Sequence, residues 1–128
     1  MSERFDDQRD AFLRALQRLR DVLAQNENEF IRDAIIQRFE FTFEMAWRSL
    51  FRLLIDRGER VGENASATLT AAHAALLIDD AERWHRVRIA RNKTSHTYDE
   101  ALAIEVSAMI RADAMPAFEA LADRLGTP

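Results

Sequence analysis

The chain has 128 residues, a hydrophobic fraction of 48% and a charged fraction of 31%, so we expect residues 1–128 to form one globular domain. Its three glycines and two prolines are too few for the turns of a β-rich fold. The formal net charge of -4 argues against a protein that coats nucleic acid with an all-over basic surface, although it leaves room for a local basic site. The absence of cysteine excludes disulfides, thiolate zinc sites and cysteine nucleophiles.

The sequence shows no signal for secretion or for a membrane. The N-terminal run MSERFDDQRD is charged, unlike a secretory signal, and no stretch approaches the roughly 20 apolar residues that span a bilayer. The lack of cysteine fits a reducing compartment. We therefore expect a cytoplasmic protein without a membrane partner.

Apolar residues recur at helical spacing from the start of the chain, which predicts a first helix from about Arg4 to Ala24. A second and longer helix is expected from about Glu29 to Arg57, with Gly58 ending it. Its apolar residues cover more than one face, so it must be buried on more than one side, and we expect a second copy of the chain to provide part of that cover. The residues that widen its apolar surface are Ile36, Phe43, Trp47 and Phe51.

Three further helical segments are expected. An alanine-rich segment from about Ser66 to Leu77 carries apolar residues at helical spacing, among them Leu76. Asp79 or Asp80 can cap a short helix through Trp84 and Ile89, after which the run from Arg91 to Tyr98 has no helical period. Asp99 can cap a last helix from about Glu100 to Leu125, which Pro116 should kink or divide. The sequence therefore predicts an all-α fold, an up-and-down bundle of four to five helices.

A local basic run stands out from the acidic chain. Between Glu82 and His96 there are four arginines, one lysine and one acid, a local charge of +4. Such a patch attracts partners that carry phosphate. The alternative is a solvated basic helix face that neighbouring acids balance. Glu40 and Glu44, on one face of the second helix, are interpreted as ordinary surface acids.

Within this run, Arg91 and His96 have the chemistry needed to cleave RNA without a metal ion. Arginine is a planar cation suited to phosphate oxygens, and histidine exchanges protons near neutral pH. The histidine would take the proton of a ribose 2′-hydroxyl while the arginine stabilised the charge that grows on phosphorus. The alternative is an arginine that caps a helix and a histidine that satisfies a loop carbonyl. The residues expected to contact RNA or a nucleotide beside this pair are Arg88, Asn92, Lys93 and Ser95.

No metal or other cofactor is expected. The three histidines lack the spacing of a metal site, and no cysteine supports them. His73 and His85 are interpreted as structural or exposed side chains.

The run from Arg91 to Tyr98 resembles the Arg-x-x-x-x-His-x-Tyr signature of HEPN proteins that pair with minimal nucleotidyltransferases. Within that superfamily the chain is most similar to the nucleotidyltransferase substrate-binding proteins. Three stretches carry the resemblance: IIQRFEFTFEMAWRSL (35–50), LLIDDAERWHRVRIARN (76–92) and KTSHTYDEALA (93–103). The alanine-rich part between Glu59 and Ala75 departs from the family pattern.

The resemblance implies a helical bundle that forms a homodimer with the two motifs facing each other across a cleft. It also implies a minimal nucleotidyltransferase as partner. In related toxin–antitoxin systems the HEPN protein is an RNase toxin, and its partner silences it by adding AMP to the motif tyrosine. Tyr98, the only tyrosine of this chain, stands at that position. An AMP group there would add negative charge that repels RNA phosphates.

Three hypotheses follow. The first is a dimeric, metal-independent endoribonuclease built on Arg91 and His96. The second is a non-catalytic subunit that docks the nucleotidyltransferase and presents a nucleotide or polynucleotide to it. The third is a helical dimerisation domain without a ligand.

Overall fold

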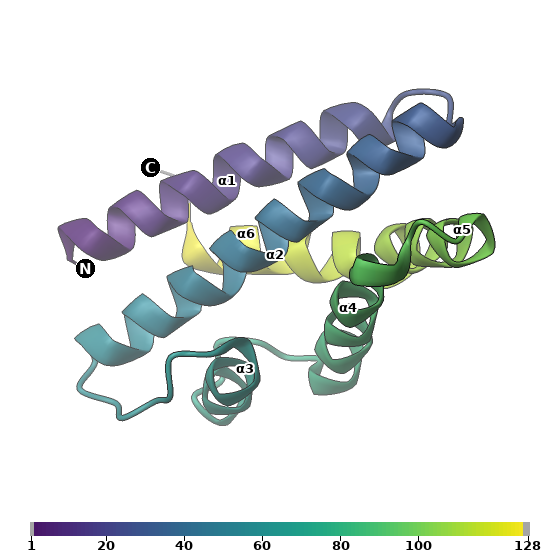
Figure 1. The fold of residues 1–128 in the computed structure, drawn as a ribbon. Helices are drawn as coiled ribbons and strands as arrows, with labels where there is room; N and C mark the ends of the chain where they lie inside the picture. The colour runs from purple at the N-terminus through teal and green to yellow at the C-terminus, as the bar shows by residue number, and fades with distance from the viewer. Residues whose placement is uncertain (1, 127–128) are drawn as a thin grey trace.

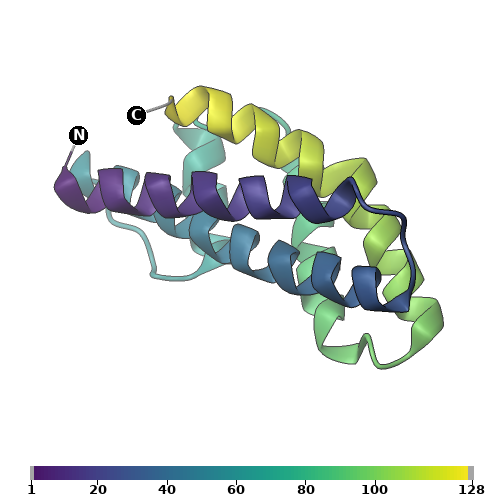
Figure 2. The ribbon, with the colours of Figure 1, turned by 90° about the horizontal axis from the view of Figure 1, so that it is seen from above.

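The computed structural model describes residues 2–126, and every regular element in that range is helical. The two longest helices, α1 (Glu3–Leu23) and α2 (Glu29–Asp56), lie side by side and antiparallel (Figures 1 and 2). α1 begins and α6 (Met115–Leu125) ends at the same end of the molecule (Figure 2). The all-α bundle predicted from the sequence is confirmed.

The remaining elements lie along the other side of α2. They are α3 (Ala65–Ala74), α4 (Ala81–Lys93), a 3₁₀ turn η1 (Thr94–His96), α5 (Glu100–Met109) and a π-helical segment η2 (Ile110–Ala114). In Figure 1, α4 stands steeply below α2, and α3 is seen almost end-on to its left, beneath the C-terminal part of α2. Within residues 2–126, no helix combines the length and the apolar character that crossing a bilayer requires.

Side-chain caps fix the first two helices close to the predicted ends. Ser2 accepts a hydrogen bond from the backbone N–H of Phe5, and Asn28 accepts one from Ile31, so each cap satisfies an N–H that the helix leaves unpaired. Gly58, with φ of 85°, follows α2 in the left-handed conformation that glycine adopts without cost. The expected end at Gly58 is confirmed.

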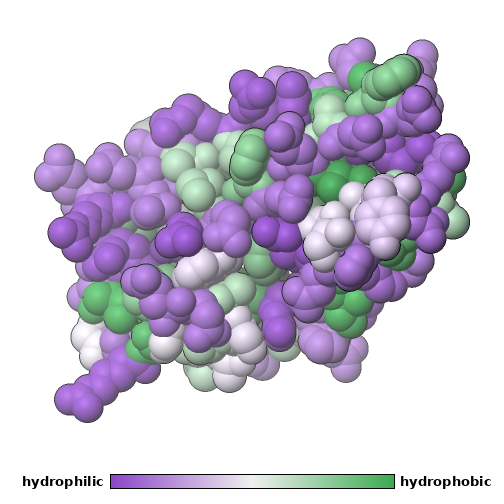
Figure 3. All heavy atoms as spheres, viewed as in Figure 1, coloured by the Kyte–Doolittle hydropathy of each residue, from purple (hydrophilic) through white to green (hydrophobic). Residues whose placement is uncertain are grey.

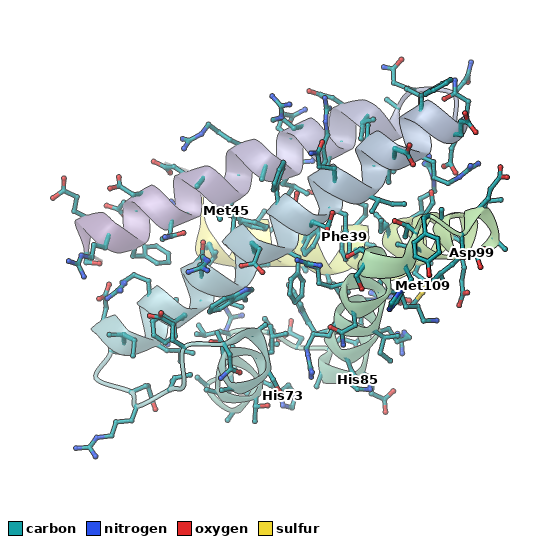
Figure 4. All side chains as sticks on the ribbon, viewed as in Figure 1. Phe39, Met45, His73, His85, Asp99 and Met109 are labelled. Atoms are coloured by element: carbon teal, nitrogen blue, oxygen red, sulfur yellow. The ribbon has the colours of Figure 1, made fainter. Side chains whose placement is uncertain are left out.

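Most of the wide apolar surface of α2 is covered within one chain. Its four widening residues are all buried, and α2 contacts α1, α3, α4 and α5. Phe39 lies in the centre of the bundle (Figure 4), where its ring packs 6.1 Å from that of Phe118 in α6. These four residues therefore do not require a second copy, whereas Phe30 and Phe41 of α2 stay exposed, and the homodimer stays a prediction.

α3 ends three residues earlier than predicted. The N–H of Leu76 donates to the carbonyl of His73 and that of Leu77 donates to Ala72, the paired bonds of a Schellman motif. Leu76 occupies the left-handed position of this motif with φ of 61°, which places its side chain in solvent. The expectation that Leu76 continues the helical stripe was wrong, because hydrophobic spacing does not detect a chain reversal at a non-glycine residue.

α4 extends further than predicted. The run from Arg91 to Tyr98 was expected to be non-helical, but α4 continues to Lys93 and passes directly into η1. Val87, Ala90 and Thr94 form one buried stripe along this path. Because the last buried member of the stripe is a threonine, a pattern of apolar residues misses it.

The last helix is divided as predicted. Asp99 caps α5 by accepting from the N–H groups of Ala101 and Leu102. The π-helical segment η2 separates α5 from α6, which carries Pro116 in its first turn. Pro116 has no N–H to give to the preceding turn, so the regular α-helical ladder is interrupted there.

One carboxylate ties the α1–α2 connection to the C-terminal helices. Glu27 accepts hydrogen bonds from Arg111 at 3.0 Å, Arg32 at 2.9 Å and Ser107 at 2.9 Å. Burial raises the pKa of Glu27, but the three hydrogen bonds and the charge of Arg111 outweigh it, so the pKa lies below the usual value for glutamate.

We expect Glu27→Gln to lower the free energy of unfolding by about 1–2 kcal/mol at neutral pH, because it removes the charge from these hydrogen bonds. A carboxylate with a lowered folded-state pKa stabilises the fold above its unfolded-state pKa, and this contribution is lost as the pH falls through the folded-state value. Urea unfolding of the variant and of the wild type should therefore converge in acid. Glu63→Gln, which alters an exposed loop acid, is the matched control; an equal loss in both variants would contradict the prediction.

Candidate nucleic-acid interface

The motif residues occupy the end of α4 and the turn that follows. Arg91 and Asn92 lie in the last turn of α4, and His96 ends η1. The backbone N–H of Asp99 donates to the carbonyl of His96 at 3.2 Å, which closes the turn before α5. Asp99 marks this turn in Figure 4. The structure thus brings the cation and the imidazole of the motif onto one short stretch of helical backbone.

Arg91 is held by two side chains, one of them from α2. Its Nη1 lies 3.2 Å from the Oε2 of Glu40 and donates to the Oγ1 of Thr94 at 2.8 Å. The Thr94 hydroxyl also lies 3.1 Å from Glu40 and 2.7 Å from the Arg91 carbonyl. The Arg91 side chain is 32% exposed, and its Nη2 makes no hydrogen bond within residues 2–126. This arrangement orients the guanidinium through Nη1, while its Nε is buried without a hydrogen-bond partner among the described residues.

Glu40 is the site residue that the sequence did not reveal. It was interpreted as a surface acid, but it is half-buried against Arg91 and Thr94. Fifty-one residues separate Glu40 from Arg91, so no local pattern could have joined them.

His96 and Tyr98 are exposed beside each other. Their ring centroids are 6.4 Å apart, with an interplanar angle of 77°. His96 makes no ion pair within the described part of the chain, and Tyr98 is 89% exposed. Both side chains are therefore accessible to a partner of this chain.

The residues expected to contact RNA are divided between two places. Asn92 and Ser95 are exposed near the motif, where the Ser95 hydroxyl donates to the Asn92 carbonyl at 3.3 Å. The ammonium of Lys93 already forms an ion pair, because its Nζ lies 2.8 Å from a carboxylate oxygen of Glu105. Arg88, about one turn before Arg91 on α4, instead lines a cavity between α3 and α4 whose lining includes neither Arg91 nor Glu40.

Acids from other helices balance most of the basic run. Arg83 and Arg86 both approach Asp113 of η2, at 3.7 and 3.1 Å, while Arg91 and Lys93 pair with acids of α2 and α5. Four of the five cations thus have a carboxylate within 4 Å, as the alternative interpretation of the basic run supposed. The face of the molecule in Figure 3 is mostly hydrophilic, with hydrophobic residues in small separate groups.

A hollow of about 490 Å³ lies beside the motif. Its lining includes Asp33, Gln37 and Glu40 of α2 together with Thr97. Two carboxylates at this surface disfavour phosphate on the α2 side of Arg91. Within residues 2–126, no group of three or more histidine, aspartate and glutamate side chains is placed to hold a metal ion.

Known proteins resemble this chain in both sequence and fold. Over 79 residues the chain is 35% identical to a Haemophilus influenzae protein named "Probable ribonuclease HepT". The aligned part is 59% of this chain and 54% of that protein, so the chain spans about half the length of the curated relative it matches.

Two solved structures superpose on most of the chain. A crystal structure from Thermus thermophilus has a TM-score of 0.80 and 28% identity, covering 91% of this chain and 99% of that one. A Haemophilus influenzae structure, described as the fold of a substrate binding domain of a nucleotidyltransferase, has a TM-score of 0.71 and 25% identity. It covers 94% of this chain and 98% of that one.

The family comparison covers nearly the whole sequence. Residues 4–127 match the family described as "Nucleotidyltransferase substrate binding protein like". The HEPN-like motif, the all-α fold and this match agree, and the chain belongs to the nucleotidyltransferase substrate-binding protein-like family.

Proposed function

We propose that this chain acts in the cytoplasm as the HEPN subunit of a two-component, toxin–antitoxin-like system with a minimal nucleotidyltransferase. In this proposal it binds the nucleotidyltransferase and, as a homodimer, cleaves RNA without a metal ion. The observation that carries the proposal is the oriented Arg91 guanidinium at the end of α4, directly before the turn that carries the exposed His96 and precedes the exposed Tyr98.

The proposed cleavage uses two groups of the motif. The His96 imidazole takes the proton of a ribose 2′-hydroxyl, and the 2′ oxygen attacks the neighbouring phosphorus. Arg91 stabilises the negative charge on the phosphorane oxygens. The bond to the 5′ oxygen breaks and that oxygen takes up a proton, leaving a cyclic phosphate and a free 5′-hydroxyl. Asn92, Lys93 and Ser95 would hold the strand beside the reacting phosphate.

His96→Ala should reduce RNA cleavage in EDTA by about 10²–10⁴-fold, the usual contribution of a general base. The assay uses protein expressed without its partner, with intact mass showing that Tyr98 carries no AMP and sedimentation showing two copies. Glu63→Gln, at an exposed residue of the loop after α2, is the control and should cleave as the wild type does. Equal cleavage by wild type and His96→Ala, with contaminating nuclease excluded, would end the ribonuclease proposal.

Glu40 is proposed as a positioning residue for Arg91. Glu40→Ala should lower kcat about 10–100-fold with little change in KM, because the guanidinium loses the contact that orients it. Glu40→Gln keeps a hydrogen-bond acceptor and should retain part of the rate. Glu44→Ala, one turn along α2, should leave the rate unchanged. Loss of rate in Glu44→Ala equal to that in Glu40→Ala would show a general effect on α2 instead.

Tyr98 is the proposed acceptor of AMP. Its hydroxyl oxygen would attack the α-phosphorus of ATP, lose its proton and release pyrophosphate. Incubation with the partner nucleotidyltransferase, ATP and Mg²⁺ should add one adenylyl group to the wild type and none to Tyr98→Phe, as measured by intact mass. Modification of Tyr98→Phe to the same extent would place the acceptor elsewhere.

The alternative is a non-catalytic subunit that presents a nucleotide or polynucleotide to the nucleotidyltransferase. It is favoured by the pairing of Arg91 with Glu40 and by the acidic hollow beside the motif, since both lower the attraction for RNA. The description of the Haemophilus influenzae structure also supports it. No cleavage by a folded, unmodified dimer, together with co-purification of the nucleotidyltransferase, would favour this function.

A further inference from the structure

Among the described residues, Arg88 is the one cation of the basic run without a carboxylate partner. Within residues 2–126, its guanidinium makes no ion pair and no side-chain hydrogen bond, whereas the other four cations of the run lie within 4 Å of an acid. Arg88 is half-buried and lines a cavity of about 260 Å³ between α3 and α4. A half-buried, unpaired guanidinium in a cavity is a favourable place for an anion.

The other polar groups of this cavity are imidazoles and hydroxyls. His73 of α3 and His85 of α4 lie on either side of the space between the two helices (Figure 4). Ser66 and Thr70 add hydroxyls; that of Thr70 donates to the Ser66 carbonyl, while the Ser66 hydroxyl makes no hydrogen bond within the described residues. In the part of the chain that the structure describes, no aspartate or glutamate lines this cavity, and neither imidazole forms an ion pair with an acid.

A second cavity differs from the α3–α4 cavity in the balance of charges that line it. The space between α4 and α6 is larger, about 440 Å³, and it also contains two arginines, Arg83 and Arg124. Asp79, Asp80 and Asp123 line the same space and offset their charge. The α3–α4 cavity has cationic and neutral donors without that compensation.

Much of the remaining lining of the α3–α4 cavity is apolar. Leu69, Ile78 and Trp84 contribute to it, and each is at least 94% buried. The volume lies just below the roughly 300–1,000 Å³ of sites for drug-sized ligands. A phosphate with its attached sugar suits such a space, because the phosphate meets the donors and the sugar meets the apolar lining.

We propose that the α3–α4 cavity binds a phosphate group, carried either as the monoester of a nucleotide or as the diester of an RNA strand, with Arg88 as its principal ligand. The planar guanidinium can donate two parallel hydrogen bonds to the phosphate oxygens, and His73, His85 and Ser66 supply further donors. This site is separate from Arg91 and His96, and it does not depend on the chain being a ribonuclease.

The imidazole resonances of the three histidines allow a direct test by NMR. Single His→Gln variants assign the signals, and inorganic phosphate, AMP and a 2′-O-methyl oligoribonucleotide are then titrated at constant pH and ionic strength. We expect His73 and His85 to shift in parallel. Shifts with phosphate or AMP would identify a monoester site, and shifts with the oligonucleotide alone would identify a site for an RNA diester.

Arg88→Gln tests the principal ligand. It should weaken binding of whichever probe shifts the His73 and His85 signals by about 10–100-fold, because the phosphate loses a charged hydrogen bond. Arg18→Gln, at an exposed arginine of α1, is the matched control for the change in net charge and should bind as the wild type does. If circular dichroism shows that Arg88→Gln does not fold, the affinity of His85→Gln is measured in its place.

Two outcomes would overturn the proposal. One is the absence of any shift at His73 and His85 with all three probes. The other is unchanged affinity in both Arg88→Gln and His85→Gln. A shift confined to His96 would also count against this cavity while supporting a nucleic-acid site at the motif, so failure here is distinguishable from failure of the proposed ribonuclease.

Discussion

The burial of α2 determines where the other helices lie, because its apolar residues extend around more than one face. α1 covers one side, and α3, α4 and α5 cover the other, so a single chain buries most of this surface and leaves Phe30 and Phe41 exposed. This arrangement also brings the middle of α2 against the end of α4. The contact of Glu40 with Arg91 is thus a consequence of the packing that buries residues such as Phe39 and Phe43.

The charges of α4 show how a sequence can overstate a basic surface. Five cations in one short run give a high local charge, but the fold brings Glu40, Glu105 and Asp113 to four of them. Such partly exposed pairs contribute little to stability. They still reduce the field that a distant phosphate experiences, and they leave the surface around Arg88 as the more positive part of the helix.

Helix number and helix order were predictable from the sequence, because apolar spacing and capping residues such as Asp80 and Asp99 act locally. The family was predictable from the resemblance of the run from Arg91 to Tyr98 to a known motif. The errors arose where an end depends on contacts elsewhere. α4 continues past Arg91 because Thr94 is buried, and α3 stops early because Leu76 adopts a left-handed conformation. The candidate catalytic pair lay within one motif, whereas Glu40 could be found only once α2 and α4 were placed side by side.

Tyr98 is 89% exposed, directly after the turn that carries His96. A group joined to its oxygen would displace no core side chain and would break no hydrogen bond within the described residues, so the free energy of unfolding would change little. Were the proposed AMP attached there, the extent of modification would depend on the enzyme that attaches it rather than on the stability of this fold.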